Sequence, residues 1–340
     1  MSKRIRLMVT DGDTWDFAQR LKDAPAARNF DVIIPKKVSE ETLREGASDA
    51  DAILCYEVGL PGSVIQAARS LKFIQKHGIN YRNIDVAVAT EKKIPVATVP
   101  LLRSITVAEH ALALLLACAR KLIPGYQAVT QGVYQKMGLE PIVTSQKQYR
   151  ANWPGIHGLT ELYQATVGIV GMGDIGMQIA KRCRAFDMSI CYYDLSPHSA
   201  DVERSFGMRY RALDELLSAS DFVILILPHT PKTEGLIGAR ELALMKSSAI
   251  LINSARGGLI DEDALVAALQ SKRIAMAGLD VYRTEPLPVT SPLMALDNVV
   301  LLPHMGGGSN RFRQVDIPAS LKNIEKFFDG EGADGIVNGL

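Results

Sequence analysis

Short apolar runs alternate with amphipathic stretches along most of this sequence. In the first hundred residues the runs are rich in Val, Ile and Leu, which is typical of buried strands, and the stretches between them have helical spacing. The expected strands are Ile5–Val9, Val32–Ile34, Ala52–Leu54, Phe73–Gln75 and Val96–Thr98, and the expected helices are Trp15–Leu21, Glu40–Glu45 and Val64–Arg69. Because such alternation covers both faces of a sheet with helices, it predicts a parallel α/β sheet.

The same rhythm resumes after residue 165 and continues almost to the end of the sequence. We expect strands at Thr166–Val170, Met188–Tyr193, Phe222–Leu227, Ala249–Asn253, Met276–Asp280 and Val299–Leu302, and helices at Leu213–Ala219, Arg240–Met245, Glu262–Gln270 and Ser309–Phe328. A second parallel sheet follows from this pattern. Two sheets in 340 residues predict a protein of two α/β domains.

A long apolar helix is expected between the two sheets, over Val107–Lys121. Thr106, with Glu109 three residues later, resembles a capping box that opens this helix. His110 lies in the buried start of the helix, and we interpret it as a structural histidine rather than a catalyst.

The stretch from residue 123 to residue 163 lacks a clean period and is rich in Gln, Gly, Pro and Tyr. Long irregular excursions in compact proteins usually carry function or form interfaces, so we interpret this one as a dimerisation arm. Lys136, Lys147 and Arg150 could form a basic lid contributed across a dimer, although a solvated arm is the favoured interpretation.

A glycine motif joins the first strand of the second sheet to a helix. Gly171, Gly173 and Gly176 have G-x-G-x-x-G spacing, and Asp194 follows at the end of the next apolar run. Such glycines permit a tight turn and a close approach of backbone to a pyrophosphate at a helix N-terminus, while the acid binds the ribose hydroxyls. The expected contacts to the dinucleotide are Gly171, Met172, Gly173, Asp174, Ile175, Gly176 and Asp194. Because a carboxylate repels a 2′-phosphate, NAD is favoured over NADP.

Composition narrows the functional classes. The net charge of +1, with no basic tract, gives no indication of a nucleic-acid partner. The N-terminus has no signal-peptide pattern, and no apolar run reaches membrane length, so we expect a cytoplasmic protein. The four cysteines lie in apolar segments without C-x-x-C spacing, which favours buried free thiols over disulfides or a metal site.

Polar residues follow several of the predicted strands. In the first sheet, Gly78 comes just after Phe73–Gln75 and would let the N–H groups of Ile79 and Asn80 face a carboxylate, although an ordinary connecting loop is an equal alternative. In the second sheet, Arg256, Asp280, Glu285 and His304 lie at or just beyond strand ends. Because parallel strands place their carboxyl ends at one edge, these four side chains could converge beside the cofactor.

That set of side chains suits hydride transfer at a 2-oxo acid. Arg256 can bind a carboxylate in two places and polarise the adjacent carbonyl. His304 can donate a proton to the carbonyl oxygen and take it back in the reverse direction. Glu285 would orient His304 and favour its charged form, and Asp280 could anchor the nicotinamide carboxamide.

The motifs VGIVGMGDIG, LPHTPKTEGLI, INSARGGLIDEDAL, GLDVYRTEPL and LLPHMGG occur in the order and spacing of the D-isomer-specific 2-hydroxyacid dehydrogenases, and the sequence resembles that family over nearly its whole length. The resemblance implies NAD as cofactor, Arg256, Glu285 and His304 as the catalytic set, and a homodimer formed through the NAD domain. It places Pro228, Thr233, Ser254, Ala255, Asp280 and Gly306 around the cofactor, and Gly78, Ile79 and Asn80 at the substrate carboxylate.

The family fold implied by the resemblance has two Rossmann-like, doubly wound parallel-sheet domains with a cleft between them. The substrate domain is discontinuous, and we expect it over residues 1–102 and 304–340. The NAD-binding domain is expected over residues 103–303, with the arm at about 123–163. The substrate is expected to be a small 2-oxo or 2-hydroxy acid.

Departures from the family pattern leave the substrate open. Many relatives carry Asn shortly before the long-helix motif, where this sequence has Val99 to Ser104. Arg103 in this stretch either pairs with a second acidic group of the substrate or is solvated. Two other functions compete: an NAD(H)-sensing interaction module of the corepressor kind, and a dehydrogenase of an oxyanion such as phosphite.

Overall fold

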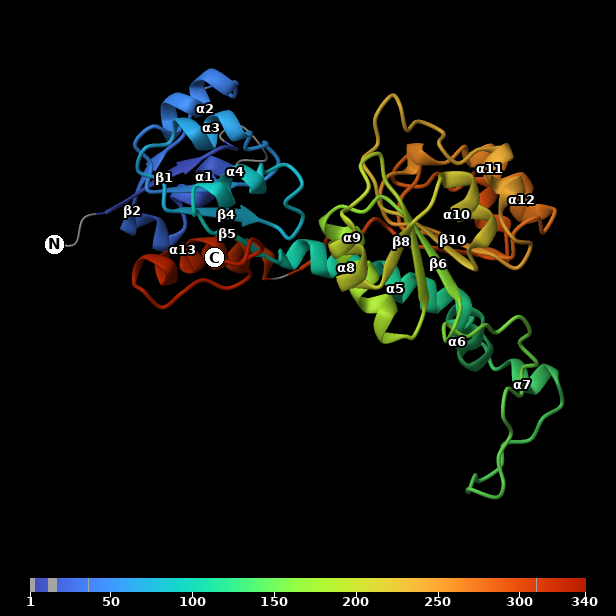
Figure 1. Cartoon of the computed structure of the whole chain (residues 1–340). Coiled ribbons are helices and arrows are strands. Elements are labelled where there is room, and N and C mark those ends of the chain that lie inside the picture. The colour runs from blue at the N-terminus through green and yellow to red at the C-terminus, as the bar shows by residue number, and fades with distance from the viewer. Residues whose placement is uncertain (1–3, 12–16, 36, 310) are drawn as a thin grey trace. The chain divides into compact units, whose positions relative to one another are not determined.

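The structure is a computed structural model, and it describes residues 4–11, 17–35, 37–309 and 311–340. The chain forms two compact units (Figure 1). The first unit comprises the chain up to Ile105 together with Gly308–Leu340, and the second comprises Thr106–Gly307. The chain therefore passes between the units twice, after Ile105 and after Gly307.

The first unit is built on a parallel five-stranded sheet with the order β2-β1-β3-β4-β5. Its strands are β1 (Ile5–Val9), β2 (Phe30–Ile33), β3 (Ala52–Cys55), β4 (Phe73–His77) and β5 (Val96–Val99). Its helices are α1 (Phe17–Lys22), α2 (Glu40–Ala47), α3 (Gly62–Ala67), α4 (Val86–Glu91) and α13 (Phe312–Phe328), with a short 3₁₀ turn at Pro25–Asn29.

Two apolar clusters cover the two faces of this sheet. One cluster contains buried residues of α2, α3 and α4, and the other contains buried residues of α1 and α13. Strands β3 and β4 are buried at every position, although only β3 is apolar throughout and β4 also buries Gln75, Lys76 and His77. The expected doubly wound parallel sheet is confirmed for this unit.

The second unit contains a parallel seven-stranded sheet with the order β12-β11-β10-β9-β6-β7-β8. Its strands are β6 (Thr166–Val170), β7 (Ser189–Tyr193), β8 (Met208–Tyr210), β9 (Phe222–Leu225), β10 (Ile250–Asn253), β11 (Met276–Leu279) and β12 (Val299–Leu301). Its own helices are α6 (Leu122–Thr130), α7 (Val133–Lys136), α8 (Asp174–Ala185), α9 (Ala200–Phe206), α10 (Leu213–Ala219), α11 (Ala239–Leu244) and α12 (Glu262–Gln270), with 3₁₀ turns at Gly257–Leu259 and Pro292–Ala295. The chain order reverses at β6, whose neighbours are β7 and β9, so the second doubly wound sheet is confirmed.

The apolar runs located the elements well, and the ends differ by a few residues. The first predicted helix includes Trp15, which lies outside the described residues, and the described helix begins at Phe17. Helices α4 and α9 and strand β8 were not predicted, because their short sequences carry no clear period. The final helix begins at Phe312 rather than at Ser309.

The prediction of a capping box at Thr106 is wrong. Helix α5 runs over Leu102–Ala119, so Thr106 lies inside it rather than at its start. A residue far away in the sequence caps the first turn instead: the N–H of Leu102 donates to Oδ1 of Asp316 at 2.6 Å. Contrary to our expectation, α5 is long and apolar enough to pass a length-and-composition test for a membrane span, but half of it is buried, as in the core helix of a globular domain.

The stretch from 123 to 163 is only partly irregular. Helices α6 and α7 occupy its beginning, and coil and turns follow up to β6. These helices were not predicted from the sequence. Much of the apolar surface of α6 is exposed, so its sequence lacks the polar face by which an amphipathic helix is identified. The four cysteines are buried free thiols, as expected.

Candidate functional site

The glycine motif forms the turn between β6 and α8. Gly171 has a φ of +102°, and its N–H donates to the carbonyl of Tyr193 at 2.8 Å. A Cβ at Gly171 would lie 2.5 Å from the Ile226 carbonyl oxygen, and one at Gly176 would lie 2.3 Å from the Gly171 carbonyl oxygen. Both positions therefore require glycine, and the tight turn brings the N-terminus of α8 to the carboxyl edge of the sheet.

Asp194 follows β7 and lies against this turn. Its Oδ2 accepts the N–H of Met172 at 2.8 Å, and its Oδ1 accepts the N–H of Ser196 at 3.1 Å. His198 also contacts the turn, with Nε2 2.8 Å from the Met172 carbonyl oxygen. The acid and the glycine turn thus form one connected structure, which is the arrangement a dinucleotide ribose and pyrophosphate need.

The loop after β10 adds a buried polar atom to this edge. Among the described residues, Oγ of Ser254 is buried and has no hydrogen-bond partner. An unpaired buried hydroxyl is costly unless a ligand or water completes it. Together with the glycine turn, this orphaned hydroxyl shows that the residues present fit a dinucleotide.

Two other predicted cofactor positions lie in the loop after β9. Thr233 donates from its hydroxyl to the Pro228 carbonyl at 2.9 Å and accepts the N–H of Thr230 at 2.8 Å. These hydrogen bonds close the Pro228–Thr233 turn, so the contact of Thr233 with a cofactor stays a prediction.

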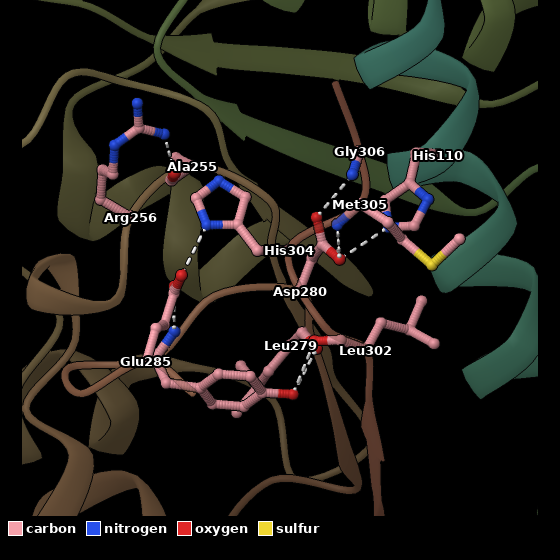
Figure 2. Close-up of polar contacts among 11 residues, drawn as sticks. His110, Ala255, Arg256, Leu279, Asp280, Glu285, Leu302, His304, Met305 and Gly306 are labelled. Carbon is pink, nitrogen blue, oxygen red and sulfur yellow. Dashed lines mark hydrogen bonds and ion pairs between the residues drawn. The ribbon is translucent and has the colours of Figure 1, made fainter. Parts of the chain in front are cut away.

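His304 and Glu285 are in direct contact (Figure 2). Nδ1 of His304 lies 2.7 Å from Oε2 of Glu285, and the other carboxylate oxygen accepts the N–H of Tyr282 at 3.1 Å. Burial would raise the pKa of Glu285, but the hydrogen bonds from His304 and Tyr282, with the nearby charge of Arg256, hold that pKa below its ordinary value. Glu285 is therefore ionised at neutral pH.

Arg256 lies in the loop after β10, at the start of a 3₁₀ turn. Its Nη1 donates to the carbonyl of Ala255 at 2.6 Å, and Asn253 holds the loop by donating to the Arg256 carbonyl at 2.9 Å and accepting the N–H of Ala255 at 3.1 Å. Asn253 was not predicted as a site residue, because its sequence gives no signal beyond its place at a strand end. Arg256 is near enough to lower the pKa of Glu285, so both belong to one electrostatic neighbourhood.

Asp280 is almost fully buried, with 1% of its side chain exposed. Its two oxygens accept the N–H groups of Met305 and Gly306, each at 2.9 Å, and Nε2 of His110 lies 3.0 Å from Oδ1. Burial raises the pKa of Asp280, but these donors outweigh it and hold the pKa below its ordinary value. The structure thus brings His110 into the neighbourhood of the predicted site, which no local sequence signal indicated. Anchoring of nicotinamide by Asp280 stays a prediction.

The predicted substrate residues of the first unit lie at the carboxyl edge of its sheet. Gly78 has a φ of +115°, and its own N–H donates to the Val99 carbonyl at 3.0 Å. Ile79 and Asn80 are half-buried, and the side-chain oxygen of Asn80 accepts from Nε of Arg82 at 3.1 Å. The role of this loop in substrate binding stays a prediction.

Arg103 lines a small cavity at the same edge, together with Phe17, Arg20, Tyr56, His77, Leu101 and Asp316. The cavity has a volume of about 20 Å³, which is room for about one water molecule. His77 is buried, with Nδ1 2.7 Å from Oγ of Ser320. Burial, followed by the positive charges of Arg20, Lys76 and Arg103, lowers the pKa of His77 to about 3, so its imidazole is neutral at physiological pH.

Comparisons with known proteins agree with this geometry. Residues 112–306 match the sequence profile described as D-isomer specific 2-hydroxyacid dehydrogenase, NAD binding domain. The chain is 35% identical to glyoxylate/hydroxypyruvate reductase B of Yersinia pestis, covering 95% of this chain and 94% of that protein. It is 36% identical to D-3-phosphoglycerate dehydrogenase of Methanocaldococcus jannaschii, where it spans 98% of its own length but only 59% of the relative.

A solved structure is similar over the same extent. The NADPH-dependent glyoxylate/hydroxypyruvate reductase of Sinorhizobium meliloti, in complex with NADP and malonate, aligns with a TM-score of 0.54 and 29% identity, over 98% of this chain and 97% of that one. The chain therefore belongs to the D-isomer-specific 2-hydroxyacid dehydrogenase family and is an oxidoreductase that uses a nicotinamide dinucleotide.

Proposed function

We propose that this protein catalyses reversible hydride transfer between NAD(H) and a D-2-hydroxy acid or the corresponding 2-oxo acid. The observation that carries the proposal is the 2.7 Å contact between Nδ1 of His304 and Glu285, beside Arg256. An imidazole paired with an ionised carboxylate is a proton donor and acceptor suited to neutral pH.

Each member of the set has its own role in the proposed reaction. Arg256 binds the substrate carboxylate through its planar fork and polarises the adjacent carbonyl. Glu285 holds Nδ1 of His304, so Nε2 faces the carbonyl oxygen and delivers a proton there. A nicotinamide cofactor, when bound, would supply the hydride for the carbonyl carbon, and the proton from His304 completes the hydroxyl group. In oxidation, His304 takes the proton back as the hydride leaves.

The cofactor is proposed to lie along the glycine turn. Gly171, Gly173 and Gly176 let the backbone and the α8 N-terminus face the pyrophosphate, and Asp194 binds the adenosine ribose. The neighbouring residues proposed to line the cofactor are Met172, Asp174, Ile175, Pro228, Thr233, Ser254, Ala255, Asp280 and Gly306. We propose NAD rather than NADP because Asp194 would repel a 2′-phosphate.

The substrate is proposed to be a small 2-oxo acid whose carboxylate also contacts Gly78, Ile79 and Asn80. Arg103 is proposed to accept a second acidic group on larger substrates. Its cavity holds about one water molecule, so such a substrate requires Arg103 or a neighbouring side chain to move.

We propose a homodimer formed through the arm at 123–163. On α6, Leu122, Ile123, Tyr126 and Val129 recur at helical spacing and are all exposed. An exposed apolar stripe of this kind is typical of an interface. A Tyr126→Asp/Val129→Asp double variant should shift the mass measured by light scattering from a dimer to a monomer. A wild-type chain that is monomeric at micromolar concentration would contradict the proposal.

The test of the function is oxidation of NADH, with NADPH in parallel, against glyoxylate, hydroxypyruvate, pyruvate, 2-oxoglutarate, oxaloacetate and bulky 2-oxo acids at neutral pH. We expect turnover with NADH on at least one acid. Phosphite with NAD⁺ is included as the oxyanion alternative. NADH binding without turnover on any of these substrates would instead favour a sensing module.

A further inference from the structure

One buried carboxylate holds the turn that carries His304. Asp280 follows β11, and its two oxygens accept the consecutive N–H groups of Met305 and Gly306, each at 2.9 Å (Figure 2). These are the two residues directly after His304. The position of the imidazole therefore depends on how firmly Asp280 is held.

The backbone of this turn needs such support. His304 has a φ of +54°, a left-handed conformation that non-glycine residues adopt only where the surrounding structure imposes it. The side chain of His304 is 43% exposed, so packing around the ring contributes little restraint. The restraints on this residue are the Glu285 contact on its ring and the Asp280 hydrogen bonds on the backbone that follows.

His110 contacts the same carboxylate from another element (Figure 2). It projects from α5, and its Nε2 lies 3.0 Å from Oδ1 of Asp280 while its side chain is 14% exposed. The N–H is not aimed straight at the oxygen, so the contact is at ion-pair distance without regular hydrogen-bond geometry, and Nε2 has no other polar partner among the described residues. Turning the ring elsewhere would leave both a buried nitrogen and part of a buried carboxylate unsatisfied.

The His110 ring also packs against the turn itself. A Cβ added to Gly306 would lie 3.2 Å from Cδ2 of His110 and 3.1 Å from Oδ2 of Asp280. The turn therefore packs directly against the His110 ring and the Asp280 carboxylate. This small cluster lies within the second unit; His110 is close in sequence to the point after Ile105 where the chain enters that unit, and Gly306 to the point after Gly307 where it leaves.

We propose that His110 is a positioning residue for catalysis: through Asp280 it holds the Met305–Gly306 turn, so that the imidazole of His304 stays against Glu285. The inference rests on the proposed function only in that it takes His304 as the proton donor. Among the described residues, no hydrogen bond or ion pair joins His110 to His304 or to Glu285.

The experiment compares His110→Phe with His110→Gln in the full-length protein. Phe keeps a ring against Gly306 but removes the donor, whereas Gln can place an amide N–H near the position of Nε2. Three quantities are measured: kcat and KM for the best 2-oxo acid, NADH affinity by fluorescence, and the ¹³Cε1–¹H resonance of His304. The resonance is assigned by its loss in His304→Gln, in protein labelled at its six histidines.

We expect His110→Phe to lower kcat by about tenfold to a hundredfold, with NADH affinity within about twofold of wild type, because misplacing a reacting group by about 1 Å can cost a hundredfold in rate. The His304 resonance should shift or broaden in His110→Phe, and His110→Gln should restore most of kcat and the resonance. Equal losses in the two variants would overturn the proposal, because they would indicate a general packing defect. An unchanged His304 resonance in His110→Phe would also overturn it.

The resonance separates this inference from the proposed function. If the wild-type protein reduced no 2-oxo acid, the function would fail, yet the dependence of the His304 environment on His110 could still be read. If the wild-type enzyme is active and the His304 resonance is unchanged in His110→Phe, only the positioning role of His110 is wrong.

Discussion

Two histidines at strand ends show how differently the two units use the same side chain. His77 ends β4 in the first unit, is buried, and has a serine hydroxyl as its polar partner, so its pKa falls to about 3. His304 follows β12 in the second unit, is partly exposed, and has the ionised Glu285 at 2.7 Å. Burial, followed by nearby positive charges, keeps the His77 imidazole neutral, whereas the His304 imidazole has a carboxylate as its partner. Position after a strand is therefore not enough to make a histidine a proton donor.

The largest expected effect compares the two histidines directly. His304→Gln should lower kcat by about 10²–10⁴-fold, the usual contribution of a general acid or base, because the proposed proton donor is lost. His77→Asn, which can keep the contact with Ser320, should stay within about threefold of wild-type kcat. Steady-state kinetics with the best 2-oxo acid measures both, and near wild-type turnover in His304→Gln would remove the proton-donor assignment.

A second comparison concerns the arginines of the two units. Arg256→Ala should lower kcat/KM for every 2-oxo acid by about a hundredfold or more, because a charge-assisted bidentate contact is lost. Arg103→Ala should affect only substrates with a second acidic group. The ratio of kcat/KM for 2-oxoglutarate to that for pyruvate measures the difference. If Arg103→Ala weakens both substrates equally, Arg103 does not read a second charge.

Asp194 offers a smaller effect confined to the second unit. Asp194→Ala should weaken NADH and remove the repulsion of a 2′-phosphate, changing the NADH-to-NADPH preference by about tenfold, the size of one charge-assisted hydrogen bond. Titration of each nucleotide by fluorescence measures the preference. Equal losses for both nucleotides would mean that Asp194 acts mainly through its hydrogen bond to Met172.

The last prediction concerns stability rather than activity, and it tests His77. Its pKa in the folded protein is about 3 and its ordinary value is 6.5, so between these pH values the unfolded chain binds a proton that the folded chain refuses. Stability should therefore fall as pH drops from 6.5 toward 3, with a slope of up to about 1.4 kcal/mol per pH unit from this group, and should be independent of this group above 6.5. Denaturant unfolding across this range should show the free energy of unfolding of wild type falling relative to that of His77→Asn as the pH drops. Parallel curves would show that His77 titrates normally.

Much of the cofactor-binding region was predictable because its signals are local. The apolar run, the glycine spacing and Asp194 lie within thirty residues, and the structure shows why two of the three glycines, Gly171 and Gly176, cannot carry a side chain. The pairing of Glu285 with His304 was also predicted, because parallel strands bring their carboxyl ends to one edge. Short elements such as α4 were not predicted. The start of α5 was placed wrongly because a hydrogen bond from Leu102 to Asp316, which is far away in the sequence, fixes it.

The sequence by itself determined two parallel sheets, the glycine turn and the strand-end residues that face one edge, because backbone periodicity and strand polarity are properties of short segments. Only the tertiary structure decided which of those residues meet. It placed His110, from a helix far earlier in the chain, 3.0 Å from Asp280, and it buried His77 while leaving His304 beside Glu285. Such contacts depend on how helices and strands pack. The local pattern of apolar and polar residues carries no information about a contact between residues 170 positions apart.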